Sequence, residues 1–82
     1  MEAKEMFEML DYKETKNDKT CIEYKNDSHG DGDYEYVKFN HMWKRYEHGY
    51  YDGYEEKRKK PTTCEVELHK AITQQMKELG WL

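Results

Sequence analysis

Apolar residues near the N-terminus recur with the period of a helix. Within residues 2–10, four apolar side chains fall at positions i, i+3, i+4 and i+7, and the charged residues Glu2, Lys4, Glu5 and Glu8 face water. A helix of nine residues is too short to be stable on its own in water. The pattern therefore predicts a short amphipathic helix that packs on the rest of the chain through Ala3, Met6, Phe7 and Leu10.

The middle of the chain alternates between polar and apolar residues, which is typical of strands. Residues 11–19 are polar without any period, and we expect a loop there. Residues 20–25 and 34–39 alternate, and the turn-forming stretch 26–33 between them predicts an antiparallel hairpin. A third strand is expected within 41–54, where two glycines indicate either a bulge or the ends of a further hairpin.

The C-terminal part predicts a second helix, over residues 63–79. Thr62 and Glu65 match a capping box at its start, and Gly80 suits the left-handed residue that follows a helix. The tryptophan after Gly80 is expected to fold back on the last turn, as in a Schellman ending. One face of this helix carries Leu68, Ala71, Ile72, Gln75, Met76 and Leu79.

Together these elements predict an α+β fold in two layers. Its order is a helix, a three- or four-stranded antiparallel meander and a C-terminal helix, with both helices on one face of the sheet. The 82 residues form one small domain over 1–82. Only ten of them are Leu, Ile, Val or Phe, so the twelve aromatic residues and five methionines must supply much of the core.

This shortage of aliphatic residues also predicts self-association as a homodimer. A meander with both helices on one side leaves its other face uncovered, and tyrosines emerging there would form an amphipathic patch. A second copy related by a two-fold axis is the commonest way to cover such a patch. The tyrosines expected to emerge are Tyr34, Tyr36, Tyr46, Tyr50 and Tyr54.

Charge is unevenly distributed along the chain. Residues 1–35 carry eleven acidic residues against five lysines, whereas residues 36–60 carry seven basic residues against four acidic ones. Such a dipole can steer a charged partner without identifying it. The acidic N-terminus has no apolar segment of the kind that targets or anchors a chain, so we expect a cytoplasmic protein without a membrane partner.

Several kinds of chemistry are disfavoured. Cys21 and Cys64 are expected to be free thiols, because disulfides are rare in cytoplasmic proteins. The stretch from Asp27 to Lys38 resembles a calcium loop only in part, since the last position would be lysine instead of glutamate. Cysteines and histidines lack the spacing of a zinc site.

Nucleophilic catalysis is also disfavoured. The Cys64 thiol lies near a helix N-terminus, which gives it some thiolate character, and His41, His48 or His69 could serve as its base, but no catalytic motif accompanies them. We expect no metal, no cofactor and no enzyme activity.

The segment 43–54 interleaves aromatic rings with basic residues and glycines. This combination is typical of a platform for nucleotides or single-stranded nucleic acid, and the same residue types anchor protein interfaces. The competing interpretation is that the tyrosines pack the sheet, because they favour strands and the chain has few aliphatic residues. The candidate partner-binding residues are Trp43, Arg45, Tyr46, Tyr50, Tyr51 and Tyr54.

Both ends of the chain resemble a family of small phage and prophage proteins of low-GC Gram-positive bacteria. The resemblance rests on the helix that contains Ala3–Glu8 and on the segment Leu68–Leu82, which ends in Glu-Leu-Gly-Trp-Leu. Where the family's first helix ends near Leu-Gly-Tyr, this chain has Leu10-Asp11-Tyr12. The resemblance implies a non-enzymatic protein that binds and inhibits a host macromolecule, such as a component of a bacterial defence system. The alternatives are a nucleotide or single-stranded nucleic-acid binder acting through segment 43–54 and an accessory phage protein.

Overall fold

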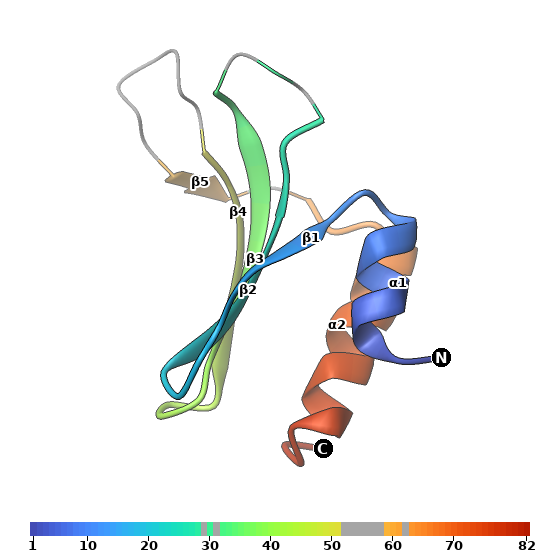
Figure 1. Cartoon of the computed structure of the whole chain (residues 1–82), viewed down its shortest axis with the longest axis vertical. Coiled ribbons are helices and arrows are strands. Elements are labelled where there is room, and N and C mark those ends of the chain that lie inside the picture. Colours follow the sequence, from blue (N-terminus) through green and yellow to red (C-terminus); the bar gives the residue numbers. More distant parts are fainter. Residues whose placement is uncertain (29, 31, 52–58, 62) are drawn as a thin grey trace.

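The computed structural model describes residues 1–28, 30, 32–51, 59–61 and 63–82. Two helices and five strands follow in the order α1 (Ala3–Met9), β1 (Lys13–Asn17), β2 (Cys21–Asn26), β3 (Tyr34–Asn40), β4 (Arg45–Tyr51), β5 (Lys59–Pro61) and α2 (Val66–Glu78). Figure 1 shows both helices side by side on one side of the twisted sheet. The predicted α+β fold, in which a helix, an antiparallel meander and a second helix form two layers, is confirmed.

The sheet is an antiparallel meander in which every strand pairs with its neighbour in sequence, in the order β1-β2-β3-β4-β5. Its register is continuous across the central strands, since Val37 of β3 lies opposite Tyr24 of β2 and His48 of β4. Because successive side chains of a strand point to opposite faces, this register decides which residues meet the helices. No helix in the described part of the chain is long and apolar enough to cross a membrane.

The core lies between the helices and the sheet, and aromatic rings fill its centre. The Phe7 ring stacks on the Tyr24 ring, with centroids 4.0 Å apart and an interplanar angle of 14°. The buried Tyr24 hydroxyl donates a hydrogen bond of 2.7 Å to the Oε1 atom of Gln75, which satisfies both polar groups. The buried cluster contains Ala3, Phe7, Tyr12, Ile22, Tyr24, Val37, Phe39, Leu68, Ala71 and Ile72.

Both helices end in the same Schellman motif. In α2, the Trp81 amide donates to the Met76 carbonyl at 2.9 Å and the Gly80 amide donates to the Lys77 carbonyl at 3.0 Å. Gly80 has a φ of 77°, so the predicted left-handed ending is confirmed.

In α1 the same two bonds run from the Tyr12 amide to the Phe7 carbonyl and from the Asp11 amide to the Glu8 carbonyl, each 3.0 Å long. Asp11 takes the left-handed position with a φ of 67°. An aspartate therefore does in α1 what glycine does in α2, at the conformational cost of a side chain in that region.

The prediction of a loop over residues 11–19 is wrong, because β1 lies within it. Lys13 pairs with Lys25 and Asn17 pairs with Ile22, but the register shifts between Glu14 and Lys16. A β-bulge adds one residue to the strand and breaks the alternation by which a strand is recognised. β1 is also an edge strand made entirely of polar residues, which is a common way to prevent sheets from pairing edge to edge.

Two further boundaries differ from the sequence-based expectation. α2 begins at Val66 rather than at residue 63, and the residue that caps it, Glu65, makes no side-chain capping hydrogen bond. The other half of the expected capping box, Thr62, lies outside the described residues. The sheet contains five strands instead of three or four, because β5 adds three residues at the edge of β4.

Candidate binding face

One face of the sheet is turned away from both helices, and we call it the open face. Because side chains alternate along a strand, Lys25, Lys38 and the residues paired with them on neighbouring strands point to the open face. Tyr24, Val37 and Phe39 point to the core. Within strands β1 to β4, the charged and aromatic members of the open face are Lys13, Lys16, Glu23, Lys25, Tyr34, Tyr36, Lys38, Arg45, Glu47 and Tyr51. These include five basic and two acidic residues, a net charge of +3, whereas the whole chain carries −4.

Three tyrosines of the open face form a continuous row. The Tyr34 and Tyr51 rings are stacked, with centroids 4.8 Å apart and an interplanar angle of 16°, and Tyr34 meets Tyr36 edge to face at 6.3 Å. Tyr36 is only 2 % exposed, and its hydroxyl donates to the Oε2 atom of Glu47 at 2.9 Å. Burial and this hydrogen bond raise the pKa of Tyr36 to about 12. Tyr34 and Tyr51 are half-buried and keep part of their rings accessible.

A lysine covers part of this row. The Nζ atom of Lys25 lies 4.5 Å from the centroid of the Tyr34 ring, in a cation–π contact. The same Nζ atom lies 3.6 Å from the Oε1 atom of Glu23. Glu23 also accepts a hydrogen bond of 3.1 Å from the Thr15 hydroxyl. The bulged residue of β1 is thereby tied to the side chains of β2.

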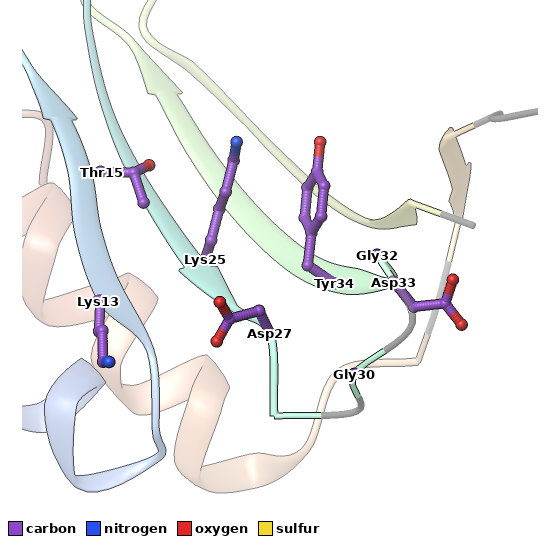
Figure 2. Close-up of a pocket in the computed structure, with 8 residues that line it drawn as sticks. All are labelled: Lys13, Thr15, Lys25, Asp27, Gly30, Gly32, Asp33 and Tyr34. Atoms are coloured by element: carbon purple, nitrogen blue, oxygen red, sulfur yellow. The ribbon is translucent and has the colours of Figure 1, made fainter. Parts of the chain in front are cut away.

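A hollow of about 410 Å³ opens at the end of the open face, beside the loop between β2 and β3. Figure 2 shows its lining, with Thr15 and Lys13 on β1, Lys25 and Tyr34 on neighbouring strands, and Asp27 at the end of β2. Gly30, Gly32 and Asp33 complete it from the loop side. The hollow is therefore built from two lysines, two carboxylates, a hydroxyl and an aromatic ring.

The loop beside the hollow has a specific local cause. The Oδ1 atom of Asn26 accepts hydrogen bonds from the Ser28 amide at 3.0 Å and from the Ser28 hydroxyl at 2.7 Å, which turns the chain at the end of β2. Gly30 has a φ of 76° and donates its amide to the Asp27 carbonyl at 3.1 Å. Two residues of the partial calcium-loop match, His29 and Asp31, lie outside the described residues.

The structure divides the predicted binding residues between three places. Tyr51 lies on the open face, whereas the register places Tyr46 opposite Phe39 and Tyr50 opposite Glu35, on the face that carries the helices. Tyr54 lies outside the described residues. Segment 43–54 therefore does not present its tyrosines on one surface. The set expected for a dimer is divided in the same way.

The remaining two candidates lie together where the turn between β3 and β4 meets the open face, since Arg45 is the first residue of β4. The Arg45 guanidinium lies 5.9 Å from the centroid of the Trp43 ring, which is 64 % exposed. The turn is fixed by a 3.0 Å hydrogen bond from the Trp43 amide to the Oδ1 atom of Asn40 and by a left-handed Lys44 with a φ of 50°. The structure thus brings Trp43 and Arg45 together as an exposed aromatic and basic pair.

The sequence does not predict Lys13, Thr15 or Lys25 as site residues, and it predicts Tyr34 only on the surface expected for a homodimer. The first two were assigned to a loop because of the bulge, and the last two belong to different strands that meet only through the register of β2 and β3. The alternation of Lys25 with the core residue Tyr24 was the one available signal. It indicates a face, but it does not indicate the neighbours on that face.

A buried polar cluster lies on the opposite, helix-facing side of β3 and β4. The Tyr12 hydroxyl donates to the Oε2 atom of Glu35 at 2.8 Å, and burial, followed by this bond, raises the pKa of Tyr12. The Nε2 atom of His48 lies 4.0 Å from the same Oε2 atom. Within the described residues this buried Nε2 atom has no hydrogen-bond partner. Burial lowers the pKa of His48, and the Glu35 carboxylate offsets part of that effect.

Stability is therefore expected to fall in mild acid because of His48. Since its pKa is lower in the folded chain than in the unfolded one, the unfolded state takes up the proton first as the pH drops below about 6.5. The loss is at most about 1.4 kcal/mol per pH unit for one proton. Urea unfolding between pH 7.5 and pH 5 measures it. His48→Gln should flatten the dependence and the exposed His69→Gln should leave it unchanged, so equal slopes for both variants would contradict the assignment.

The two cysteines differ in their exposure to solvent. Cys21 is buried and Cys64 is exposed, and both are free. Contrary to the thiolate character considered from the sequence, partial desolvation and the neighbouring Glu65 carboxylate raise the pKa of Cys64. Among the described residues, no three His, Cys, Asp or Glu side chains form a group that could hold a metal ion.

Comparison of the chain with family models, curated proteins and solved structures gives no match.

Proposed function

We propose that this protein is a non-enzymatic, phage-type protein that binds a host macromolecule and inhibits it, with a component of a bacterial defence system as the target and the host cytoplasm as the place of action. The open face is the observation that carries this proposal. It offers two accessible tyrosines, Tyr34 and Tyr51, amid basic side chains, and neither helix covers it. Tyrosine and arginine are enriched among the residues that anchor protein interfaces.

The turn between β3 and β4 extends this surface. Trp43 and Arg45 lie in contact there, next to Met42, which is 79 % exposed. Arg45 belongs to the open face by register, so the turn and the face form one continuous surface. An aromatic ring, a guanidinium and a methionine are side chains that protein partners commonly cover.

Charge supports an acidic partner surface for the open face. The net charge of +3 on its residues in β1 to β4 is opposite in sign to that of the chain, and this asymmetry steers association with a negatively charged patch. The bound protein then inhibits its target by steric hindrance. The acidic remainder of the molecule supports a second mode, in which its carboxylates take the place of nucleic acid on the target.

A nucleotide or single-stranded nucleic acid is the second candidate ligand. The observation that favours it is the stack of Tyr34 on Tyr51 with the Lys25 ammonium beside it, since aromatic rings and cations together bind bases and phosphates. These residues differ from those expected within segment 43–54, apart from Tyr51.

The test is protection of a phage from defended host cells. Strains that each carry one defence system are infected with a phage that the system restricts, with and without the protein. We expect plaque formation to be restored in the strain whose system is the target. The double variant Tyr34→Ala, Tyr51→Ala should lose this effect, because removing an interface anchor lowers affinity by about 30-fold or more.

Met9→Ala is the matched control, because Met9 is a large exposed side chain on α1, away from the open face. Circular dichroism should show that both variants are folded. Restoration that survives the double variant would remove the open face from the proposal, and restriction that persists in every strain would contradict the inhibitory function. Light scattering at tens of micromolar tests the homodimer separately, since the mass of a single chain would contradict it.

A further inference from the structure

We propose that the hollow at the end of the open face binds a nucleoside phosphate, either free or at the end of a strand. Its lining combines the three groups that such a ligand requires: ammonium groups for the phosphate, an aromatic ring for the base and a carboxylate for sugar or base donors. Its volume of about 410 Å³ lies within the usual range for small-molecule sites. The assignment uses the same face as the proposed function but does not require a protein target.

The two lysines provide the first argument. Lys13 and Lys25 lie directly opposite each other in the pairing of β1 with β2. Like charges at directly opposed positions destabilise a sheet. Lys25 has Glu23 as a partner at 3.6 Å, whereas Lys13 has no carboxylate within ion-pair distance among the described residues. A phosphate in the hollow would supply Lys13 with the partner that it lacks and would offset this repulsion.

The aromatic row provides the second argument. Tyr34 lines the hollow and is held by Tyr51, whose ring is nearly parallel to it, so the ring is fixed in position before a ligand arrives. Lys25 lies over the accessible part of the Tyr34 ring. Its side chain is long and half-exposed, so its ammonium group can move toward a phosphate. A base can then stack on the tyrosine while the lysine contacts the phosphate of the same ligand.

The carboxylates restrict the ligand class. The Asp27 carboxylate lies between the two lysines, whereas the Asp33 carboxylate points away from them, so a small anion alone meets repulsion as well as attraction. Asp33 already accepts a 2.5 Å hydrogen bond from the Tyr50 hydroxyl. Asp27 is exposed at the end of β2, where its carboxylate can accept hydrogen bonds from ribose hydroxyls or from an exocyclic amine. The site therefore favours a ligand with donors next to its phosphate.

Titration calorimetry and amide NMR with adenosine 5′-monophosphate test this site. We expect saturable binding that weakens with salt, with amide shifts confined to β1, the end of β2 and the loop before β3. Lys13→Met should weaken binding by about tenfold, the typical effect of one lost charge-assisted contact. Tyr34→Leu should weaken it comparably. Lys4→Met, which removes an exposed lysine from α1, is the matched control and should change nothing.

Adenosine and inorganic phosphate separate the two halves of the ligand, and each alone should bind at least tenfold more weakly. Equal affinity for phosphate, equal affinity for adenosine, or the same affinity in Lys13→Met would overturn the assignment. A 5′-phosphorylated oligonucleotide that binds more tightly than the mononucleotide identifies a strand end as the source, and equal binding identifies the free nucleotide. Binding of the mononucleotide without any protection of phage would contradict the proposed function while leaving the site intact.

Discussion

Replacing Phe7 by alanine is expected to lower the free energy of unfolding by about 4 kcal/mol, the range observed for a fully buried phenylalanine. Phe7 has no exposed surface. Its ring stacks on Tyr24 and meets Tyr12 and Phe39 edge to face, at centroid distances of 5.9 and 6.2 Å. The side chain therefore joins α1 to β2, to β3 and to the start of β1.

The cavity left by this change cannot readily close. Two of the surrounding tyrosines are fixed by hydrogen bonds, Tyr24 to Gln75 at 2.7 Å and Tyr12 to Glu35 at 2.8 Å, so moving either ring inward would strain or break a buried bond. The cost should therefore lie toward the upper part of the range for large-to-small changes.

Urea unfolding followed by circular dichroism measures the effect of Phe7→Ala. Met9→Ala, on the same helix, removes a side chain that is 72 % exposed and should cost less than about 0.5 kcal/mol. A loss for Phe7→Ala within about 1 kcal/mol of this control would show that α1 does not depend on the aromatic cluster for its attachment.

The helices could be predicted from the sequence because each has an apolar stripe that one segment reveals by itself. The apolar stripe of α1 is buried in the core at Ala3 and Phe7. The stripe of α2 is buried there at Leu68, Ala71 and Ile72. The strands were easier to predict the more of their residues are buried. β2 and β3 each bury one face and were found, whereas β1 buries little and contains a bulge.

The candidate site was harder to predict for a different reason. Segment 43–54 is dense in aromatic residues, but a strand places successive side chains on opposite faces, so Tyr50 and Tyr51 of β4 are separated by the sheet. The partner that Tyr51 does meet is Tyr34, seventeen positions away in sequence. Such neighbours depend on the register between strands, which no local pattern specifies.

Removing Gly80, Trp81 and Leu82 is expected to cost about 3 kcal/mol and to lower the melting temperature by about 12–24 °C in a domain of this size. The truncation deletes both hydrogen bonds of the α2 ending and the Trp81 ring, which packs 6.2 Å from the Phe39 ring at the edge of the core. Calorimetry measures the change. Gly80→Ala isolates the backbone contribution, because an added Cβ meets nothing within 4 Å and only the left-handed conformation is penalised, by about 1 kcal/mol.

The ending of α1 offers a second test of the cost of a side chain at the left-handed position, with the opposite expected effect on stability. Asp11 occupies the left-handed position that Gly80 occupies in α2, so Asp11→Gly should raise the free energy of unfolding, by up to about 1 kcal/mol, whereas Gly80→Ala lowers it. Both motifs also place an aromatic ring directly after the left-handed residue, Tyr12 against Phe7 and Trp81 against Phe39. A truncated chain with an unchanged melting temperature would show that the α2 ending does not hold the helix to the sheet. An Asp11→Gly variant that is less stable than the native chain would contradict the conformational cost assigned to Asp11.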